Sequence, residues 1–281
     1  MNVFITGSTG KVGSRFVPRI LQRGHHVKLL VRDAAKADWF HQQGAVVLEG
    51  DLLQPDNYVD ALRGIDVVVH LAAEFRGVDE NTARRSNIDG SIALAHAALK
   101  ADVPRFVFSS TNWVYSSGNH SRPSREDDDL KPALTTYPQT KVAAEDALLR
   151  LQREQGLGLR ILRLPFVYGE RDPHITEALP LMRNWNPAKR LHMVHHADAS
   201  QALMLAASYP GIDGRIYNVA DDAPISVAEL FQIHHSEISS EAQQQEFNPW
   251  DMIVDTTRIR DELHYRPIFP SFYSARDAGA I

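Results

Sequence analysis

The first thirteen residues constrain the fold of this chain more than any other stretch. Val3-Phe4-Ile5 is a short apolar run that leads directly into Thr6-Gly7-Ser8-Thr9-Gly10-Lys11-Val12-Gly13, and apolar residues then recur at helical spacing. This order predicts a strand, a glycine turn and a helix. Gly7 permits the tight turn, Gly10 lets the backbone approach a pyrophosphate, and Gly13 lets the helix pack close to the sheet. The pattern predicts a phosphate-binding turn, although a glycine-rich turn without a ligand is the alternative.

The same alternation of strand and helix continues along the chain. Apolar runs predict strands at 27–31, 45–48, 66–73, 106–108 and 159–164. Helical spacing fills the intervals at 34–43, 56–62, 79–101 and 137–151. This alternation predicts an α/β fold of the Rossmann type, a doubly wound parallel sheet covered on both faces.

Beyond Gly169 the alternation loosens, and a small C-terminal substrate-binding lid is predicted. Residues 170–190 read as irregular, followed by short strands near 193–194 and 216–219 and helices at 226–234 and 257–263. The predicted domains are a dinucleotide-binding Rossmann domain at 1–169, with 191–220 contributing returning elements, and the lid at 170–190 and 221–281.

The end of the second strand carries information about the cofactor. In this fold an acid at that place binds the 2′-hydroxyl of the adenosine ribose, whereas an arginine accommodates a 2′-phosphate. Arg32 comes first after the strand, with Asp33 behind it, and Lys11 in the glycine turn adds positive charge nearby. The arrangement favours NADP over NAD; NAD stays open if Asp33 takes the ribose.

Tyr137 and Lys141 suggest proton transfer, because residues four apart lie on one face of a helix. A free phenol has a pKa of about 10, and a neighbouring ammonium is expected to lower it. The preceding strand ends in Ser109-Ser110-Thr111. Thr111 is therefore a candidate to donate a hydrogen bond to the substrate oxygen beside the tyrosine. A Tyr–Lys pair alone is common on helix surfaces, so the glycine turn and the hydroxyl residues give the pair its significance.

With these pieces in place, the chain closely resembles the extended short-chain dehydrogenase/reductase family, often called NAD-dependent epimerase/dehydratase-like. The matching motifs are Thr6 to Gly13, Gly50-Asp51-Leu52, His70-Leu71-Ala72-Ala73, Asn87-Ile88-Asp89-Gly90, Phe108 to Thr111, Tyr137 with Lys141, Tyr168-Gly169, Val194 to Asp198, and Tyr217-Asn218-Val219. The resemblance implies catalytic roles for Thr111, Tyr137 and Lys141. It also implies a homodimer formed through the two long helices.

The expected cofactor contacts combine the glycine turn, the strand ends and the catalytic helix. They are Gly7, Thr9, Gly10, Lys11, Val12, Gly13, Arg32, Asp51, Leu52, Leu71, Ala72, Ala73, Ser109, Tyr137, Lys141, Pro165 and Val167. The candidate substrate contacts are Phe75, Asn112, Trp113 and Phe166. Nucleotide-sugar members of the family usually carry an asparagine where this chain has Phe166, and an apolar ring cannot replace an amide donor to a diphosphate.

The leading hypothesis is an NADP-preferring oxidoreductase that interconverts a carbonyl and an alcohol on a small or medium-sized substrate, with Tyr137 as general acid and base. One alternative is a nucleotide-sugar epimerase or dehydratase that retains NAD. Another is a non-catalytic regulator that senses a dinucleotide.

Composition narrows the remaining classes. A net charge of −5 without Lys/Arg runs gives no electrostatic footprint for nucleic acid or an anionic membrane. The sequence has no cysteine, and adjacent histidines such as His195-His196 point to opposite faces of a strand, so no metal is expected. The chain enters a strand at once and has no long apolar stretch, which indicates a cytoplasmic protein.

Overall fold

The computed structural model describes residues 1–116 and 121–281, which group into two compact units. The first unit comprises Met1–Thr111, Leu134–Arg163 and Ser200–Ile216, and the second comprises the described parts of Asn112–Ala133, Leu164–Ala199 and Tyr217–Ile281. The ranges expected from sequence placed 112–133 and 164–169 in the dinucleotide-binding domain. In the grouping given above, the described residues of 112–133 and residues 164–169 belong to the second unit.

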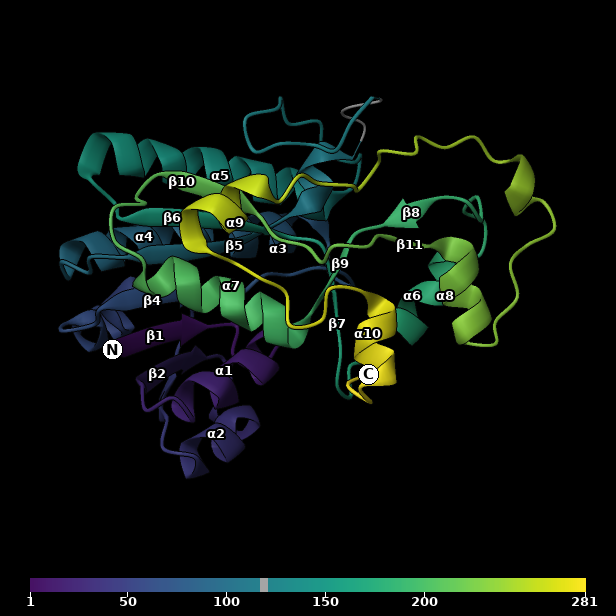
Figure 1. Cartoon of the computed structure of the whole chain (residues 1–281). Coiled ribbons are helices and arrows are strands. Elements are labelled where there is room, and N and C mark those ends of the chain that lie inside the picture. The colour runs from purple at the N-terminus through teal and green to yellow at the C-terminus, as the bar shows by residue number, and fades with distance from the viewer. Residues whose placement is uncertain (117–120) are drawn as a thin grey trace. The chain divides into compact units, whose positions relative to one another are not determined.

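A seven-stranded sheet forms the centre of the first unit, in the order β10-β6-β5-β4-β1-β2-β3 (Figure 1). The strands are β1 (Asn2–Thr6), β2 (His26–Val31), β3 (Val46–Glu49), β4 (Val67–His70), β5 (Phe106–Thr111), β6 (Leu159–Leu164) and β10 (Arg215–Asn218). The pairs β3–β2, β2–β1, β1–β4 and β4–β5 are parallel. The order reverses direction between β1 and β4, so both strands end at the point where such folds bind ligands.

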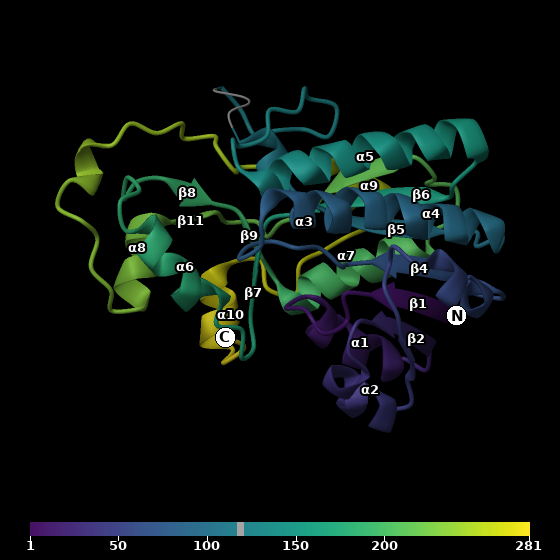
Figure 2. The same cartoon turned by 180° about the vertical axis from the view of Figure 1, so that it is seen from behind.

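Helices cover both faces of this sheet, as Figures 1 and 2 show from opposite sides. One face carries α3 (Glu80–Arg84), α4 (Gly90–Lys100) and α5 (Thr136–Gln155), and the other carries α1 (Gly13–Leu21), with α2 (Asp38–Gln42) near it, and α7 (His196–Ser208). The longest helix, α5, ends at Gly156, whose φ of 75° provides the left-handed cap that glycine adopts without steric cost. The predicted doubly wound Rossmann fold is confirmed.

The core of the first unit lies between the sheet and helices α4 and α5. Phe4, Phe106 and Ile161 project from strands, and Leu94 and Leu148 project from the two helices, all fully buried. Burial of each such side chain contributes roughly 1.5–3 kcal/mol. This apolar layer fixes α5 against the sheet and therefore holds its first turn near the end of β5.

Three predicted helices differ from the structure. Residues 34–43 form a 3₁₀ segment at Ala34–Ala37 followed by α2. Residues 56–62 form two short 3₁₀ segments, Pro55–Asn57 and Val59–Leu62, because Tyr58 between them has a non-helical backbone and donates its hydroxyl to the Leu52 carbonyl. The expected single helix over 79–101 is α3 and α4 joined by a π-helical segment at Arg85–Asp89. Such segments often occur at functional sites.

The second unit contains two small strand pairs and short helices. Strand β7 (Phe166–Tyr168) pairs in parallel with β9 (Met193–His195), and β8 (Arg190–Leu191) pairs antiparallel with β11 (Ile225–Ser226). The helices are α6 (His174–Met182), α8 (Val227–Ile233), α9 (Thr257–Leu263) and α10 (Phe272–Asp277). Ser226 caps α8 through a capping box with Glu229.

The irregular reading of residues 170–190 is wrong, because α6 occupies His174–Met182. Ile175, Ala178, Leu179 and Met182 are all buried along one face of this helix. Pro173 precedes the helix and Pro180 lies inside it, and these prolines obscured the helical spacing of the apolar residues.

Candidate active site

The glycine turn between β1 and α1 has no room for side chains. Gly7 has a φ of 73°, and a Cβ there would lie 2.4 Å from the Ala72 backbone nitrogen. A Cβ on Gly13 would lie 2.2 Å from the Gly7 carbonyl oxygen. A Cβ on Gly10, by contrast, would lie 3.3 Å from the Gly7 carbonyl oxygen and otherwise face open space. Gly10 lines the cavity described next. The turn therefore packs closely on one side and offers bare backbone on the other.

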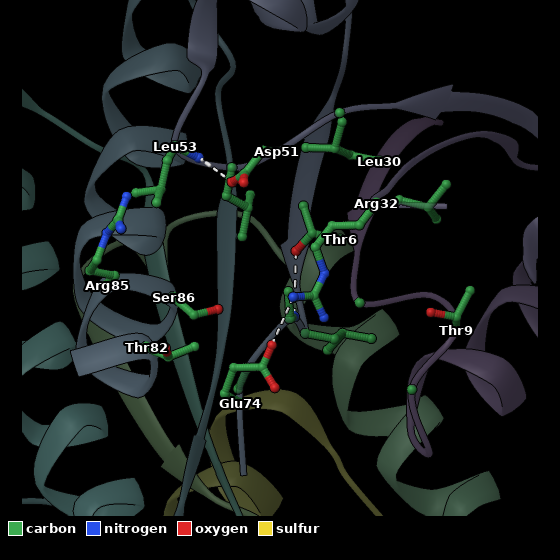
Figure 3. Close-up of a pocket in the computed structure, with 18 residues that line it drawn as sticks. Thr6, Thr9, Leu30, Arg32, Asp51, Leu53, Glu74, Thr82, Arg85 and Ser86 are labelled. Atoms are coloured by element: carbon green, nitrogen blue, oxygen red, sulfur yellow. Dashed lines mark hydrogen bonds and ion pairs between the residues drawn. The ribbon is translucent and has the colours of Figure 1, made fainter. Parts of the chain in front are cut away.

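A cavity of about 360 Å³ lies within the first unit, beyond the carboxyl ends of β1 to β4 (Figure 3). Its volume falls in the range typical of small-molecule and cofactor sites. The lining residues are Thr6, Gly7, Thr9, Gly10, Leu30, Val31, Arg32, Gly50, Asp51, Leu52, Leu53, Leu71, Ala72, Ala73, Glu74, Thr82, Arg85 and Ser86.

Nine of the predicted cofactor contacts line this cavity: Gly7, Thr9, Gly10, Arg32, Asp51, Leu52, Leu71, Ala72 and Ala73. Lys11, Val12, Gly13, Ser109, Tyr137 and Lys141 belong to the same unit but not to the lining. Nine lining residues were not among the predicted contacts. Thr6, Leu30, Val31, Gly50 and Leu53 are neighbours of predicted positions, whereas Glu74 and three residues of the helical stretch, Thr82, Arg85 and Ser86, are new. Glu74 lies four residues beyond β4 and is positioned by the Asn87 amide, so neither it nor the helical residues carried a signal in the local sequence.

The two residues after β2 face different environments. Arg32 lines the cavity, and its guanidinium lies 2.9 Å from a Glu74 carboxylate oxygen. Asp33 is outside the lining; its carboxylate accepts a hydrogen bond from the Ala35 backbone N–H at 3.1 Å and lies 3.8 Å from Lys36. Asp33 therefore caps the short 3₁₀ turn that follows the strand.

A buried polar chain lies beneath the glycine turn. His70 is fully buried, and its ring nitrogens lie 2.6 Å from the Thr6 hydroxyl and 2.9 Å from the Ser91 hydroxyl. Burial, with a smaller contribution from the Lys141 charge, lowers the pKa of His70 to about 3. The ring is therefore neutral and ties β1, β4 and α4 together rather than serving as an acid or base.

Lys141 is buried and held at the end of β5. Its ammonium donates a hydrogen bond of 2.8 Å to the Ser109 carbonyl and lies 4.6 Å from the centre of the Phe108 ring. Desolvation lowers the pKa of Lys141 to about 7, while the Glu145 carboxylate one turn further along α5 acts in the opposite direction. The pKa of Lys141 is thus close to neutral pH.

Tyr137 lies in the first turn of α5, and the Phe75 ring packs edge-on against it at 4.7 Å between ring centres. Burial raises the pKa of Tyr137. This differs from the expected lowering, because the Lys141 ammonium is directed to the Ser109 carbonyl and lies 5.8 Å from the centre of the phenol ring. Phe75, a predicted substrate contact, is therefore placed beside the predicted catalytic tyrosine.

Asn87 in the π-helical segment connects the cavity to the start of α5. Its amide nitrogen donates to the Thr140 hydroxyl and to the Glu74 carbonyl, both at 2.9 Å, and Thr140 in turn donates to the Tyr137 carbonyl at 2.8 Å. The Asn87 amide oxygen accepts from the Glu74 N–H at 2.7 Å. Sequence reasoning quoted Asn87 as part of a motif but assigned it no role.

Glu145 and Arg163 form an ion pair beyond Lys141. Their side chains are 1% and 2% exposed, and two guanidinium nitrogens contact the carboxylate, the shortest contact being 2.5 Å. Because Glu145 follows Lys141 by one helical turn, the predicted catalytic lysine lies next to a buried ion pair whose two charges neutralise each other.

The remaining predicted contacts are spread over the two units. Thr111 ends β5 in the first unit and is 7% exposed. Pro165, Val167, Asn112, Trp113 and Phe166 belong to the second unit and are described within it. There the Asn112 amide donates to the Met252 carbonyl at 3.1 Å, Trp113 packs on the apolar core, and the Phe166 ring stacks on His174 at 4.0 Å.

The described residues provide neither a cluster of metal ligands nor a helix able to span a membrane. Across 1–116 and 121–281, no group of three or more histidine or acidic side chains is arranged to hold a metal ion. Over the same residues, no helix combines the length and the apolar character that crossing a bilayer requires.

Comparison with known proteins gives one family model and several relatives. The family model described as NAD dependent epimerase/dehydratase family matches residues 3–220. The chain is 29% identical over 246 residues to a 4-hydroxy-2-methyl-3-oxo-4-farnesyl-3,4-dihydroquinoline-1-oxide ketoreductase of Stigmatella aurantiaca, covering 83% of this chain and 72% of that protein. It is 25% identical over 244 residues to a decarboxylating sterol-4-alpha-carboxylate 3-dehydrogenase of Dictyostelium discoideum, covering 82% and 74%.

The structural comparison concerns the fold alone. The UDP-glucose 4-epimerase of Thermotoga maritima, solved with UDP-glucose, superposes with a TM-score of 0.80 at 22% identity and covers 99% of both chains. The fold described above is therefore shared over the full length.

Proposed function

Because the chain belongs to the NAD dependent epimerase/dehydratase family, we propose that it is an NADP-preferring enzyme that interconverts a carbonyl and an alcohol on a small or medium-sized substrate. Membership makes it an NAD(P)-dependent oxidoreductase of the extended short-chain dehydrogenase/reductase type. The observation that carries the proposed chemistry is the placing of Tyr137 and Lys141 on one face of α5, with Lys141 held on the Ser109 carbonyl at the end of β5.

A nicotinamide cofactor, when bound, supplies or accepts the hydride. The residues that fit it are the bare glycine turn and the lining of the 360 Å³ cavity, where Gly10 presents backbone without a side chain. Tyr137 gives its phenolic proton to the carbonyl oxygen during reduction and takes it back during oxidation. Thr111 orients the same oxygen through its hydroxyl. Since burial raises the pKa of Tyr137, the phenol is kept protonated, which suits proton donation in the reductive direction.

The preference for NADP is supported by the different placing of Arg32 and Asp33. Arg32 lines the cavity, where it is available to a 2′-phosphate, whereas the Asp33 carboxylate is engaged in capping a turn. A carboxylate used in this way is a weak candidate for the ribose 2′-hydroxyl of NAD. Titration of the protein with NADP⁺ and NAD⁺ tests the preference directly, and tighter binding of NAD⁺ would overturn it.

A non-nucleotide substrate is supported by Phe166 and by the relatives. The Phe166 ring is 8% exposed and stacked on His174, so this position offers no donor to a diphosphate. The two relatives named above are a ketoreductase and a sterol-4-alpha-carboxylate 3-dehydrogenase, and neither name refers to a sugar nucleotide. A carbonyl on a ring system is therefore the first class of substrate to test.

A nucleotide-sugar epimerase or dehydratase with retained NAD is the second candidate. The likeness to a UDP-glucose 4-epimerase favours it at the level of fold. A non-catalytic dinucleotide sensor is a third candidate, and the presence of Thr111, Tyr137 and Lys141 together argues against it.

Turnover of the cofactor separates these functions. The wild type is incubated with NADPH and a panel of cyclic ketones, and the nicotinamide absorbance is followed. Stoichiometric loss of absorbance is expected, and Tyr137→Phe should abolish it while Tyr273→Phe, which removes a phenol bonded to Glu229 in the second unit, should not. Conversion of UDP-sugars without net change in absorbance would instead establish the epimerase.

We also propose a homodimer formed through α4 and α5. These helices pack side by side on one face of the sheet (Figures 1 and 2). Light scattering is expected to give twice the 31.5-kDa mass of the chain, and a monomer at micromolar concentration would reject the assembly.

A further inference from the structure

Glu74 occupies a fixed place on the wall of the cofactor cavity. It follows Ala72-Ala73 after β4, and its backbone N–H and carbonyl are both hydrogen-bonded to the side-chain amide of Asn87, at 2.7 and 2.9 Å. Asn87 is itself 1% exposed and bonds Thr140 on α5. The main chain at Glu74 is therefore clamped from a buried residue and cannot swing away from the cavity.

The side chain of Glu74 reaches Arg32 across the cavity, as Figure 3 shows. The Glu74 side chain is 18% exposed, whereas the Arg32 side chain is 76% exposed. The pair is thus asymmetric, with a largely buried carboxylate on a backbone held by Asn87 and a largely exposed guanidinium at the end of β2.

Other nearby charges do not take the place of either partner. Lys36 lies 3.8 Å from Asp33 on the turn after β2, outside the cavity lining. Asp51, the second carboxylate in the lining, accepts a hydrogen bond from the Leu53 N–H at 2.9 Å. Arg85 lines the cavity from the helical stretch and is exposed. Among the lining residues, Arg32 and Glu74 form an ion pair with each other, at 2.9 Å.

We propose that Glu74 is a specificity-determining residue for the cofactor, which competes with the 2′-phosphate of NADP for Arg32. The inference rests on the proposed role of Arg32 in binding that phosphate. NADP must draw the guanidinium from Glu74 and accommodate its own phosphate near the Glu74 carboxylate, whose backbone is held on the cavity wall. NAD has no 2′-phosphate and needs neither change. Glu74 therefore weakens NADP binding selectively. It makes the preference for NADP over NAD smaller than the preference that Arg32 alone would give.

The test is a double-mutant cycle on cofactor binding, which requires no substrate. Dissociation constants of NADP⁺ and NAD⁺ are measured by calorimetry for the wild type, Glu74→Gln, Arg32→Gln and the double variant. Glu74→Gln is expected to tighten NADP⁺ binding about fivefold, equal to about 1 kcal/mol, and to change NAD⁺ binding less than twofold. In the Arg32→Gln background the same substitution should have no selective effect.

A control and a salt series exclude a general charge effect. Glu80→Gln removes the same charge from α3, at a residue outside the cavity lining, and should alter neither constant. The gain of Glu74→Gln should shrink as ionic strength rises, because the competing contacts lie at a largely exposed arginine.

The outcomes separate this inference from the function it rests on. Suppose that Arg32→Gln weakens NADP⁺ binding. If Glu74→Gln then leaves NADP⁺ binding unchanged, or strengthens the binding of NAD⁺ as much as that of NADP⁺, Arg32 keeps its role and the role of Glu74 is refuted. If Arg32→Gln leaves the NADP⁺ constant unchanged, the NADP assignment fails, and the competition fails with it. The fragments 2′,5′-ADP and 5′-AMP, which differ only in the 2′-phosphate, repeat the comparison with the nicotinamide half removed, and an equal effect of Glu74→Gln on both would refute the competition.

Discussion

Replacement of Lys141 by methionine should stabilise the protein while destroying its activity. The pKa of the buried ammonium falls from its ordinary 10.5 to about 7. At about 1.4 kcal/mol per pKa unit, this corresponds to ~5 kcal/mol of destabilisation when the group is charged. Methionine loses the hydrogen bond to the Ser109 carbonyl, worth about 1.5–3 kcal/mol for a charged donor. A net gain of ~2 kcal/mol is therefore expected below pH 7.

The pH dependence gives this prediction its sharpest form. Between pH 7 and about 10 the unfolded wild type binds a proton at Lys141 that the folded state has lost, so its stability should rise with pH in that window. The methionine variant lacks this titration. Its advantage should be full below pH 7, shrink to about zero near pH 8.5 and reverse in sign by pH 9.5, because the wild type gains about 1.4 kcal/mol per pH unit in this window.

The measurement is the melting temperature of both proteins from pH 6 to 9.5, with a gain on the order of 4 °C expected at pH 6. Lys100→Met, which removes an exposed lysine from the last turn of α4, is the matched control and should give a small offset independent of pH. If the melting temperatures of Lys141→Met and the wild type differed by the same amount at every pH, burial would not lower the pKa of Lys141, and the prediction would be refuted.

Three further predictions concern packing and charge. Glu145→Gln leaves the charge of Arg163 buried and uncompensated, so it should lower the free energy of unfolding by roughly 3–5 kcal/mol, seen as a lower melting temperature. Asp60→Asn, in an exposed pair with Arg63, should change the melting temperature little. Equal effects of the two substitutions would contradict the role of burial. Glu145→Gln should also lower the pKa of Lys141 further, observable by NMR of isotopically methylated lysines, since the carboxylate is the group that raises it. Gly13→Ala should abolish calorimetric NADP⁺ binding because its Cβ would lie 2.2 Å from the Gly7 carbonyl oxygen, while Gly24→Ala, with open space and a φ of 77°, should cost only about 1 kcal/mol and keep binding.

Sequence periodicity predicted most of the first unit, since buried parallel strands are continuous apolar runs and the glycine turn has a distinctive spacing. The failures have local causes. Tyr58 broke an expected helix through its non-helical backbone, and Pro173 and Pro180 hid the apolar face of α6. These are effects of single residues on backbone conformation, which periodicity averages out.

Prediction of the site was uneven for a similar reason. Gly7, Arg32 and Asp51 follow strands directly, so strand order alone brings them to one edge of the sheet, and all three line the cavity. Glu74 lies four residues beyond its strand, and its position depends on the Asn87 amide from a separate helix. Contacts of this kind depend on tertiary structure and have no signature in local sequence.

The π-helical segment Arg85–Asp89 also restricts the number of residues that can lie between α3 and α4. Each residue advances a helix by about 100°, so one residue more than an α-helix requires sets the stretches before and after it out of phase by that angle. Thr82 before the segment faces the cavity, and Leu94 after it faces the core. Deletion of a single residue there would regularise the helix and could keep only one of those two faces in place. A family alignment that puts a gap within Arg85–Asp89 would therefore mistake cavity positions for core positions.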